Sequence, residues 1–168
     1  MRKPFRRHRG ARGAAAVEFA LVMPILFLVM FGILQYGLYF NDALSTRQGV
    51  REAARLGVVQ SYSGDGCTSG ADMTKLACRT KKQIDVLTGT AYTKVSASSW
   101  TKGAPLTVCA LVKTETAGLA PMPNNGWILS KTQMSIEVAS STPSPLTAES
   151  APALPTGTDI PTWSSVGC

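Results

Sequence analysis

The sequence predicts an α+β protein. A long N-terminal transmembrane helix continues into a small extracytoplasmic head with a second helix and a short antiparallel sheet. Three observations lead to this fold class. A strongly apolar run from Ala14 to Phe40 contains one charged side chain, an amphipathic stretch follows at 71–88, and alternating apolar positions follow residue 105. Spacings of three and four are typical of helices, whereas alternation is typical of strands.

The composition divides the chain into four segments. The net charge of +7 comes almost entirely from residues 1–13, which hold six basic side chains and no acidic one. A basic leader ahead of an apolar run is typical of a membrane segment with a cytoplasmic N-terminus, and it does not indicate nucleic-acid binding. The segments are a basic leader (1–13), a long helix (14–59, membrane-spanning at about 17–40), an α+β head (60–139) and a Ser/Thr/Pro-rich tail (140–168).

The apolar run is long enough to cross a bilayer. Its 27 residues exceed the about 20 that a spanning helix needs, and an outer aromatic belt would lie near Tyr36 and Phe40. A secretory signal peptide fits less well, because its apolar region is about 7–15 residues long and its small residues follow that region. Here the small residues from Ala14 to Ala16 come first. A plain signal anchor remains an open alternative.

Glu18 is the charged residue of this run. One interpretation is that Glu18 has no specific partner. Its carboxylate would then extend to the membrane interface, as a side chain near the end of a spanning helix can. The other is that the charge is held for a partner. If the chain were cut after Gly13, Ala14 would become the N-terminus and Glu18 the fifth residue. The new α-amine and the carboxylate of a neighbouring subunit could then pair and set the axial offset between helices.

The stretch "RGAAAVEFALVMPILFLVMFGILQYG" resembles the N-terminus of TadE-like minor pilins, in the Tad/Flp branch of the type IV pilins. The matching features are the basic leader, Gly13, Glu18 followed by Phe19, and the "EFALVMP" core, and the likeness covers about residues 9–58. It implies a pilin-like lollipop shape and cleavage between Gly13 and Ala14 by a prepilin peptidase. It also implies that Glu18 and Phe19 act in assembly.

The resemblance also implies a function and a place in the cell. The chain would be a minor pilin, built through its N-terminal helix into a Tad/Flp-type pilus or its base. Its partners would be the prepilin peptidase, other pilin subunits, the assembly machinery and membrane lipid. It would sit in the bacterial inner membrane with the head outside, and on the pilus or cell surface after assembly. Two alternatives stay open: a single-pass anchored surface protein with a binding head unrelated to pili, and a secreted protein released by signal peptidase.

The helix is expected to continue beyond the membrane to residue 59. Pro24 removes one backbone hydrogen bond inside the span and predicts a kink there. Further on, one face carries a stripe of small residues, which are Ala43, Val50, Ala54 and Gly57. Arg47, Arg51 and Arg55 recur every four residues and predict a basic ridge on a solvated face. Contact of this ridge with acidic lipid headgroups or neighbouring subunits is the alternative.

The head is expected to combine a helix with about three strands. The helix at 71–88 would begin near Asp72, end before Gly89 and bury Met73, Leu76, Ala77, Ile84 and Leu87. Two segments alternate clearly, 105–116 and 133–140, the second through Met134, Ile136 and Val138; a weaker strand is expected at 91–98. The tail after residue 140 is expected to be extended, with docking through Trp163 and Cys168.

Four cysteines follow the apolar run, namely Cys67, Cys78, Cys109 and Cys168. None has zinc or redox spacing, and an even number beyond a membrane indicates two disulfides in an oxidising compartment. We favour Cys67–Cys78 with Cys109–Cys168, and buried free thiols are the alternative.

Catalysis is not expected. His8 is the single histidine and lies in the leader, so the head cannot build a triad that needs one. Asp65 and Asp72 are interpreted as turn and cap residues, and Trp100 and Trp127 as packing residues. No metal or cofactor is expected, and we predict that the protein is not an enzyme.

Overall fold

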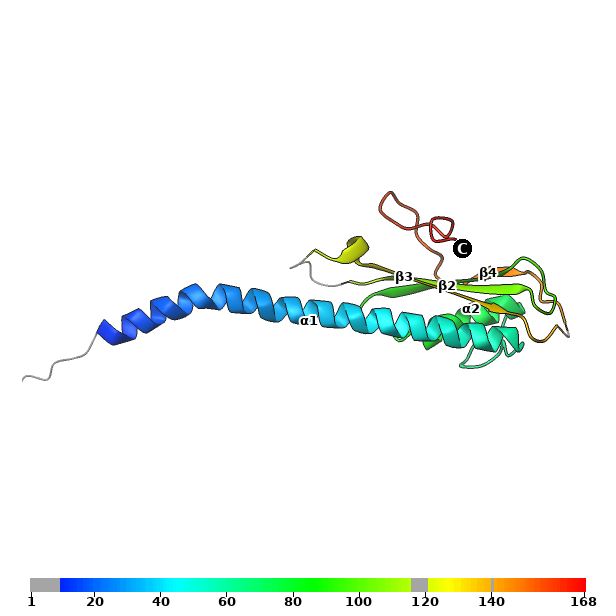
Figure 1. Ribbon diagram of the computed structural model, residues 1–168, viewed down its shortest axis with the longest axis horizontal. Coiled ribbons are helices and arrows are strands. Elements are labelled where there is room, and N and C mark those ends of the chain that lie inside the picture. Colours follow the sequence, from blue (N-terminus) through cyan, green and yellow to red (C-terminus); the bar gives the residue numbers. More distant parts are fainter. Residues whose placement is uncertain (1–9, 116–120, 140) are drawn as a thin grey trace, which may run out of the picture.

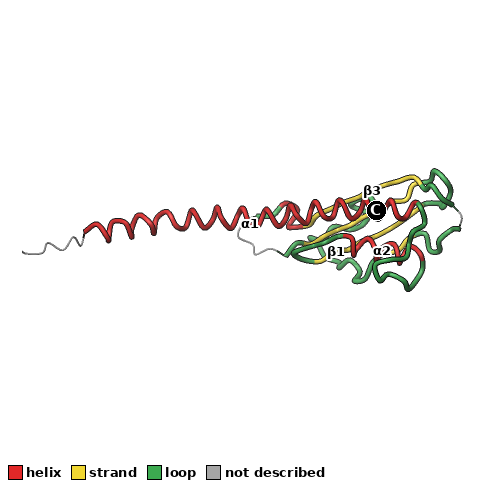
Figure 2. Tube along the Cα trace, turned by 90° about the horizontal axis from the view of Figure 1, so that it is seen from below, coloured by secondary structure: helices red, strands yellow, loops and turns green. Residues whose placement is uncertain are grey.

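The computed structural model describes residues 10–115, 121–139 and 141–168. It has the α+β layout that the sequence predicts: a long apolar helix, a second helix and a small antiparallel sheet. The long helix, α1 (Gly10–Val58), projects far beyond the head, which lies along its C-terminal half (Figures 1 and 2). His8 and most of the basic leader lie outside the described residues.

The head packs on the predicted small-residue stripe of α1. Val50, Ala54 and Gly57 are buried there, and Ala43 is partly buried against the core. A Cβ atom at Gly57 would lie 2.5 Å from Leu106 and 2.7 Å from Leu76, so the glycine permits this close approach. The arginines at 47, 51 and 55 are exposed. α1 begins four residues before the predicted start and ends one residue before the predicted end.

The second helix, α2 (Asp72–Gln83), is shorter than the sequence predicts. Met73, Leu76 and Ala77 are buried as expected, but the prediction that helix continues to residue 88 is wrong. Ile84 is already extended, and Leu87, which we placed in the apolar stripe, is 60 % exposed. The chain thus leaves the helical path at Ile84, and the amides of residues 87 and 88 bind Asp42 of α1, as described below.

The sheet has four strands in the order β3-β2-β1-β4, all antiparallel: β1 (Thr90–Ala97), β2 (Pro105–Lys113), β3 (Trp127–Ser135) and β4 (Thr147–Glu149). The first two agree with the predicted strands. The prediction of a strand at 133–140 is wrong, because β3 starts and ends earlier. After Ser135 the chain turns onto α1, where the amides of Glu137 and Val138 donate to the carbonyl oxygen of Val58.

The two faces of the sheet have different covers. α1 and α2 cover one face, and the C-terminal tail lies across the other (Figure 1). The tail is bonded to β2 through the predicted Cys109–Cys168 disulfide, and it also supplies β4, a strand that the sequence did not predict. Lys131 donates to the carbonyl oxygen of Gly167. This cover explains why Cys109 and Leu111, on the outer face, are fully buried.

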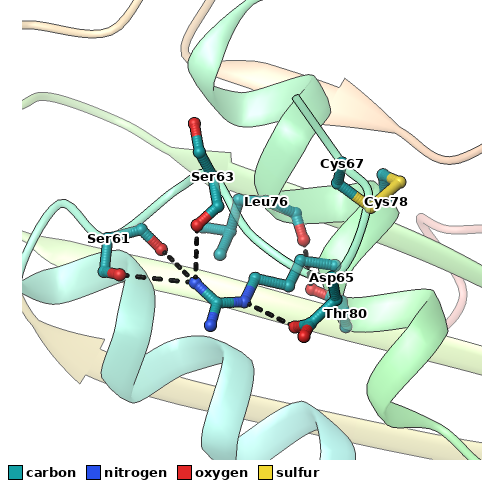
Figure 3. A network of polar contacts seen from close by, with 8 residues as sticks. Ser61, Ser63, Asp65, Cys67, Leu76, Cys78 and Thr80 are labelled. Atoms are coloured by element: carbon teal, nitrogen blue, oxygen red, sulfur yellow. Dashed lines mark hydrogen bonds and ion pairs between the residues drawn. A yellow bond between two sulfur atoms is a disulfide. The ribbon is translucent and has the colours of Figure 1, made fainter. Parts of the chain in front are cut away.

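An arginine organises the loop between the two helices (Figure 3). The guanidinium of Arg79 donates to the carbonyl oxygens of Ser61 (3.0 Å) and Ser63 (3.1 Å) and forms an ion pair with Asp65 (3.0 Å). The Cys67–Cys78 disulfide joins the same loop to α2. The two disulfides in the structure are the pairs that the sequence favoured.

Removing the Cys109–Cys168 bond should weaken the head more than removing Cys67–Cys78. The first spans 59 positions and the second 11, and the cost of closing a loop in the unfolded chain rises with its length. We expect Cys109→Ala/Cys168→Ala to lower the free energy of unfolding by about 4 kcal/mol, and Cys67→Ala/Cys78→Ala by about 3 kcal/mol. Denaturant titration of the detergent-solubilised chains measures both. A larger loss of unfolding free energy for Cys67→Ala/Cys78→Ala would contradict the idea that the disulfide to the tail stabilises the head more.

Candidate membrane-spanning and assembly helix

The N-terminal half of α1, up to residue 34, has no cover from the head, and the head begins to contact the helix at residues 35–39. Between residues 17 and 40 it exposes fifteen large apolar side chains, which are Val17, Phe19, Leu21, Val22, Ile25, Leu26, Phe27, Leu28, Val29, Met30, Phe31, Ile33, Leu34, Leu38 and Phe40. Within the described part of the chain, one helix is long and apolar enough to cross a membrane, and it is α1. Each such side chain gains about 1.5–3 kcal/mol from full burial, so this surface requires lipid or other helices around it. The free half of α1 therefore indicates a single-pass membrane anchor.

Glu18 lies on this free half, close to its start, and is exposed. The residues one turn away on either side are apolar: Ala14 and Ala15 before it, Leu21 and Val22 after it. None of them can pair with a carboxylate. The next acidic residue along α1 is Asp42, about 36 Å further at 1.5 Å per residue. Among the side chains that the structure describes, Glu18 is therefore an isolated negative charge on an apolar surface.

The predicted processing and assembly positions all lie in the same part of α1. Gly13 and Ala14 are inside the helix, a few residues after its first residue. A side chain at Gly13 would meet no other atom within 4 Å. Phe19 is exposed beside Glu18. Pro24 lies within the continuous helix, whose N-terminal part curves (Figure 1), and a kink at this proline stays a prediction.

Asp42 fixes the head to the helix, a role that the sequence pattern did not predict. The side chain is fully buried. Its carboxylate accepts hydrogen bonds from the amide of Leu87 (2.9 Å) and from the amide and hydroxyl of Thr88 (3.4 and 2.9 Å). One turn and a half earlier, the Tyr36 hydroxyl donates to the carbonyl oxygen of Pro121 (2.8 Å). The signal in the sequence was a carboxylate just after the apolar run, at a position that helical spacing places beside the small-residue stripe.

The polar groups of the head serve its structure. Asp65 pairs with Arg79, and Asp72 pairs with Lys75 (3.1 Å) in the first turn of α2. Among the described residues no group of three or more His, Cys, Asp or Glu side chains could hold a metal ion. Burial, followed by the nearby Asp72 carboxylate, raises the pKa of Tyr62 to about 12. This hydroxyl therefore stays protonated at neutral pH.

The comparisons with known proteins bear on the same part of the chain. Residues 13–55 match the sequence model of a family described as TadE-like protein. No curated protein and no solved structure matches the chain. The matched segment runs from the predicted cleavage position through the apolar half of α1 to the small-residue stripe. This N-terminal part is therefore similar to TadE-like proteins, as the sequence indicated, and the likeness suggests a protein associated with the Tad pilus.

Proposed function

We propose that the chain is a minor pilin subunit that is built through α1 into a Tad/Flp-type pilus or its base. The observation that carries this proposal is the free half of α1, an apolar surface with one isolated carboxylate. It coincides with the segment that matches TadE-like proteins. Before assembly, lipid covers this surface; after assembly, the helices of other pilin subunits cover it. The role is structural, and no step requires catalysis by this chain.

Processing removes residues 1–13. A prepilin peptidase cuts between Gly13 and Ala14, a bond that lies within the first turns of α1. A protease needs its substrate extended, so these turns must unwind first. Glycines at positions 10 and 13 favour this, because each makes a helix less stable by about 1 kcal/mol than alanine would. The helix start thus combines the cleavage position with a locally weak backbone.

Glu18 directs assembly after processing. The cut gives Ala14 a positive α-amine, four positions before the Glu18 carboxylate. Inside a bundle of apolar helices these charges attract each other far more strongly than in water. The amine of one subunit and the carboxylate of the next pair there, which fixes the axial shift between neighbouring helices at a few ångströms. Without this pair, apolar contacts alone would allow several registers.

The proposed orientation places the leader in the cytoplasm and the head outside. The concentration of basic residues in 1–13 favours this direction of insertion. The two disulfides of the head fit an oxidising compartment. The prepilin peptidase, other pilin subunits, the assembly machinery and lipid are then the partners.

Replacing Glu18 tests the assembly role directly. We expect Glu18→Ala to insert normally but to enter the pilus fraction at least about tenfold less, which corresponds to the loss of about 1.4 kcal/mol. The matched control is Glu52→Ala, because Glu52 is an exposed carboxylate on the outer part of the same helix. Quantitative immunoblots of sheared pili and membranes measure both. Normal incorporation of Glu18→Ala would remove the proposed role, and a membrane-bound, never assembled wild type would favour the plain surface anchor.

A further inference from the structure

A groove opens where α1 leaves the head, between the helix and the start of β3. Its volume is about 310 Å³. The α1 side supplies Tyr39, Phe40, Leu44 and Arg47, and the β3 side includes Trp127 and Leu129. The walls are thus mainly aromatic and aliphatic. The guanidinium of Arg47 lies at the end of the groove that is further from the membrane-spanning half of α1. Leu44 is 57 % exposed although it lies beside the packed core.

The level of this groove along α1 follows from helix geometry. Phe40 lies 22 residues after Glu18, which is about 33 Å along the helix axis. The hydrocarbon core of a bilayer is about 30 Å thick. If Glu18 lies at one interface, Phe40 and the floor of the groove therefore lie at the other. The Tyr36–Pro121 hydrogen bond holds the loop before β3 at the same level.

The cation lies at the height of lipid headgroups. Arg47 is seven residues beyond Phe40, about 10 Å further out. Side chains on a helix point back toward its N-terminus, so the guanidinium reaches down toward the level of Leu44. Aromatic side chains and arginine at this depth are typical of membrane interfaces.

We propose that this groove binds a phospholipid of the outer leaflet, with its phosphate at Arg47 and the upper part of its acyl chain against the exposed side chains of Phe40, Leu44 and Leu129. The inference rests on the membrane anchoring proposed above and goes beyond it. It makes the edge of the head a second lipid contact, which holds the head upright on the membrane before assembly. The continuity of the groove with the apolar half of α1 and the single cation at its outer end favour lipid over a second copy of the chain.

Photocrosslinking of the full-length chain in nanodiscs tests the proposal. The discs contain equal parts of phosphatidylcholine and phosphatidylglycerol, and p-benzoylphenylalanine replaces Leu44 or Leu129. Val59 is the matched control, because it is 47 % exposed and lies about 22 Å beyond Leu44. We expect phospholipid adducts by mass spectrometry at Leu44 and Leu129 and at least tenfold fewer at Val59. Equal yields at the three positions, or crosslinks to a second protein chain, would overturn the proposal.

A probe at Leu28 separates this inference from the anchoring itself. Leu28 lies on the free half of α1 and should crosslink lipid whenever the helix is inserted. Adducts at Leu28 without adducts at Leu44 and Leu129 would overturn the groove alone. No adducts at Leu28 would overturn the anchoring and the groove together. Arg47→Gln should lower the ratio of phosphatidylglycerol to phosphatidylcholine in the Leu44 adducts about fivefold, whereas Arg55→Gln should leave this ratio unchanged.

Discussion

Replacing Gly13 with leucine is expected to abolish removal of the leader and, with it, entry into the pilus. A leucine side chain at the residue before the cut would not fit a peptidase site that accepts glycine, and leucine also strengthens the helix that must unwind. The fold is not the cause, because a side chain at Gly13 would meet no other atom within 4 Å. N-terminal sequencing should then give the unprocessed start, and the sheared pilus fraction should lack the chain.

Gly32→Ala is the matched control for this change. Gly32 lies on the same free half of α1, and a side chain there also meets no other atom within 4 Å. This variant should be processed and assembled like the wild type. Normal processing of Gly13→Leu would contradict cleavage at this bond.

Replacing Gly89 with alanine is expected to destabilise the head by about 3 kcal/mol or more. Gly89 has a φ of +110°, a conformation that L residues rarely adopt. An alanine Cβ would overlap the carbonyl oxygen of Lys113 and lie 2.9 Å from its carbonyl carbon. Since backbone atoms cannot move aside as a side chain can, β1 would have to shift against β2. A loss of this size is a large part of the 5–15 kcal/mol that stabilises a typical domain.

Gly103 provides the matched control for Gly89. It also has a positive φ, +87°, but a side chain there would meet no other atom within 4 Å. Gly103→Ala should therefore show backbone strain alone, about 1 kcal/mol. Denaturant unfolding of both detergent-solubilised variants, with disulfides intact, compares the two free energies. Equal losses would show that the overlap of a side chain at position 89 with the Lys113 backbone does not add to the loss of stability.

The sequence predicted the elements whose pattern is local. The apolar run, the small-residue stripe and the alternation of β2 each appear within a few turns of one segment, and α1 and β2 lie where these patterns indicate. The predicted end of α2 was wrong, and the segment that follows the helix makes contacts with a distant residue instead. Asp42 binds the amides of residues 87 and 88, and no local signal shows that bond.

The tail shows the same limit. Its many Ser, Thr and Pro residues indicate an extended chain, and most of it has no regular secondary structure. Composition does not show that such a chain covers a sheet. That outcome depends on the Cys109–Cys168 bond, on β4 pairing with β1, and on the apolar outer face of β2.

The candidate site divides in the same way. Glu18 and Gly13 could be singled out because they lie close together in an unusual segment, and a known family shares that segment. The groove beside Arg47 could not, because its two walls come from α1 and from residues about 80 positions later. Only the packing of the sheet against the helix brings them together.

In the proposed function, a trimmed apolar helix with a negative charge near its new end joins this chain to other pilin subunits. The most direct measurement is the N-terminal residue of the wild-type chain recovered from sheared pili, determined by sequencing and intact mass. We expect a start at Ala14. A chain that keeps residues 1–13 and is found solely in membranes would contradict it.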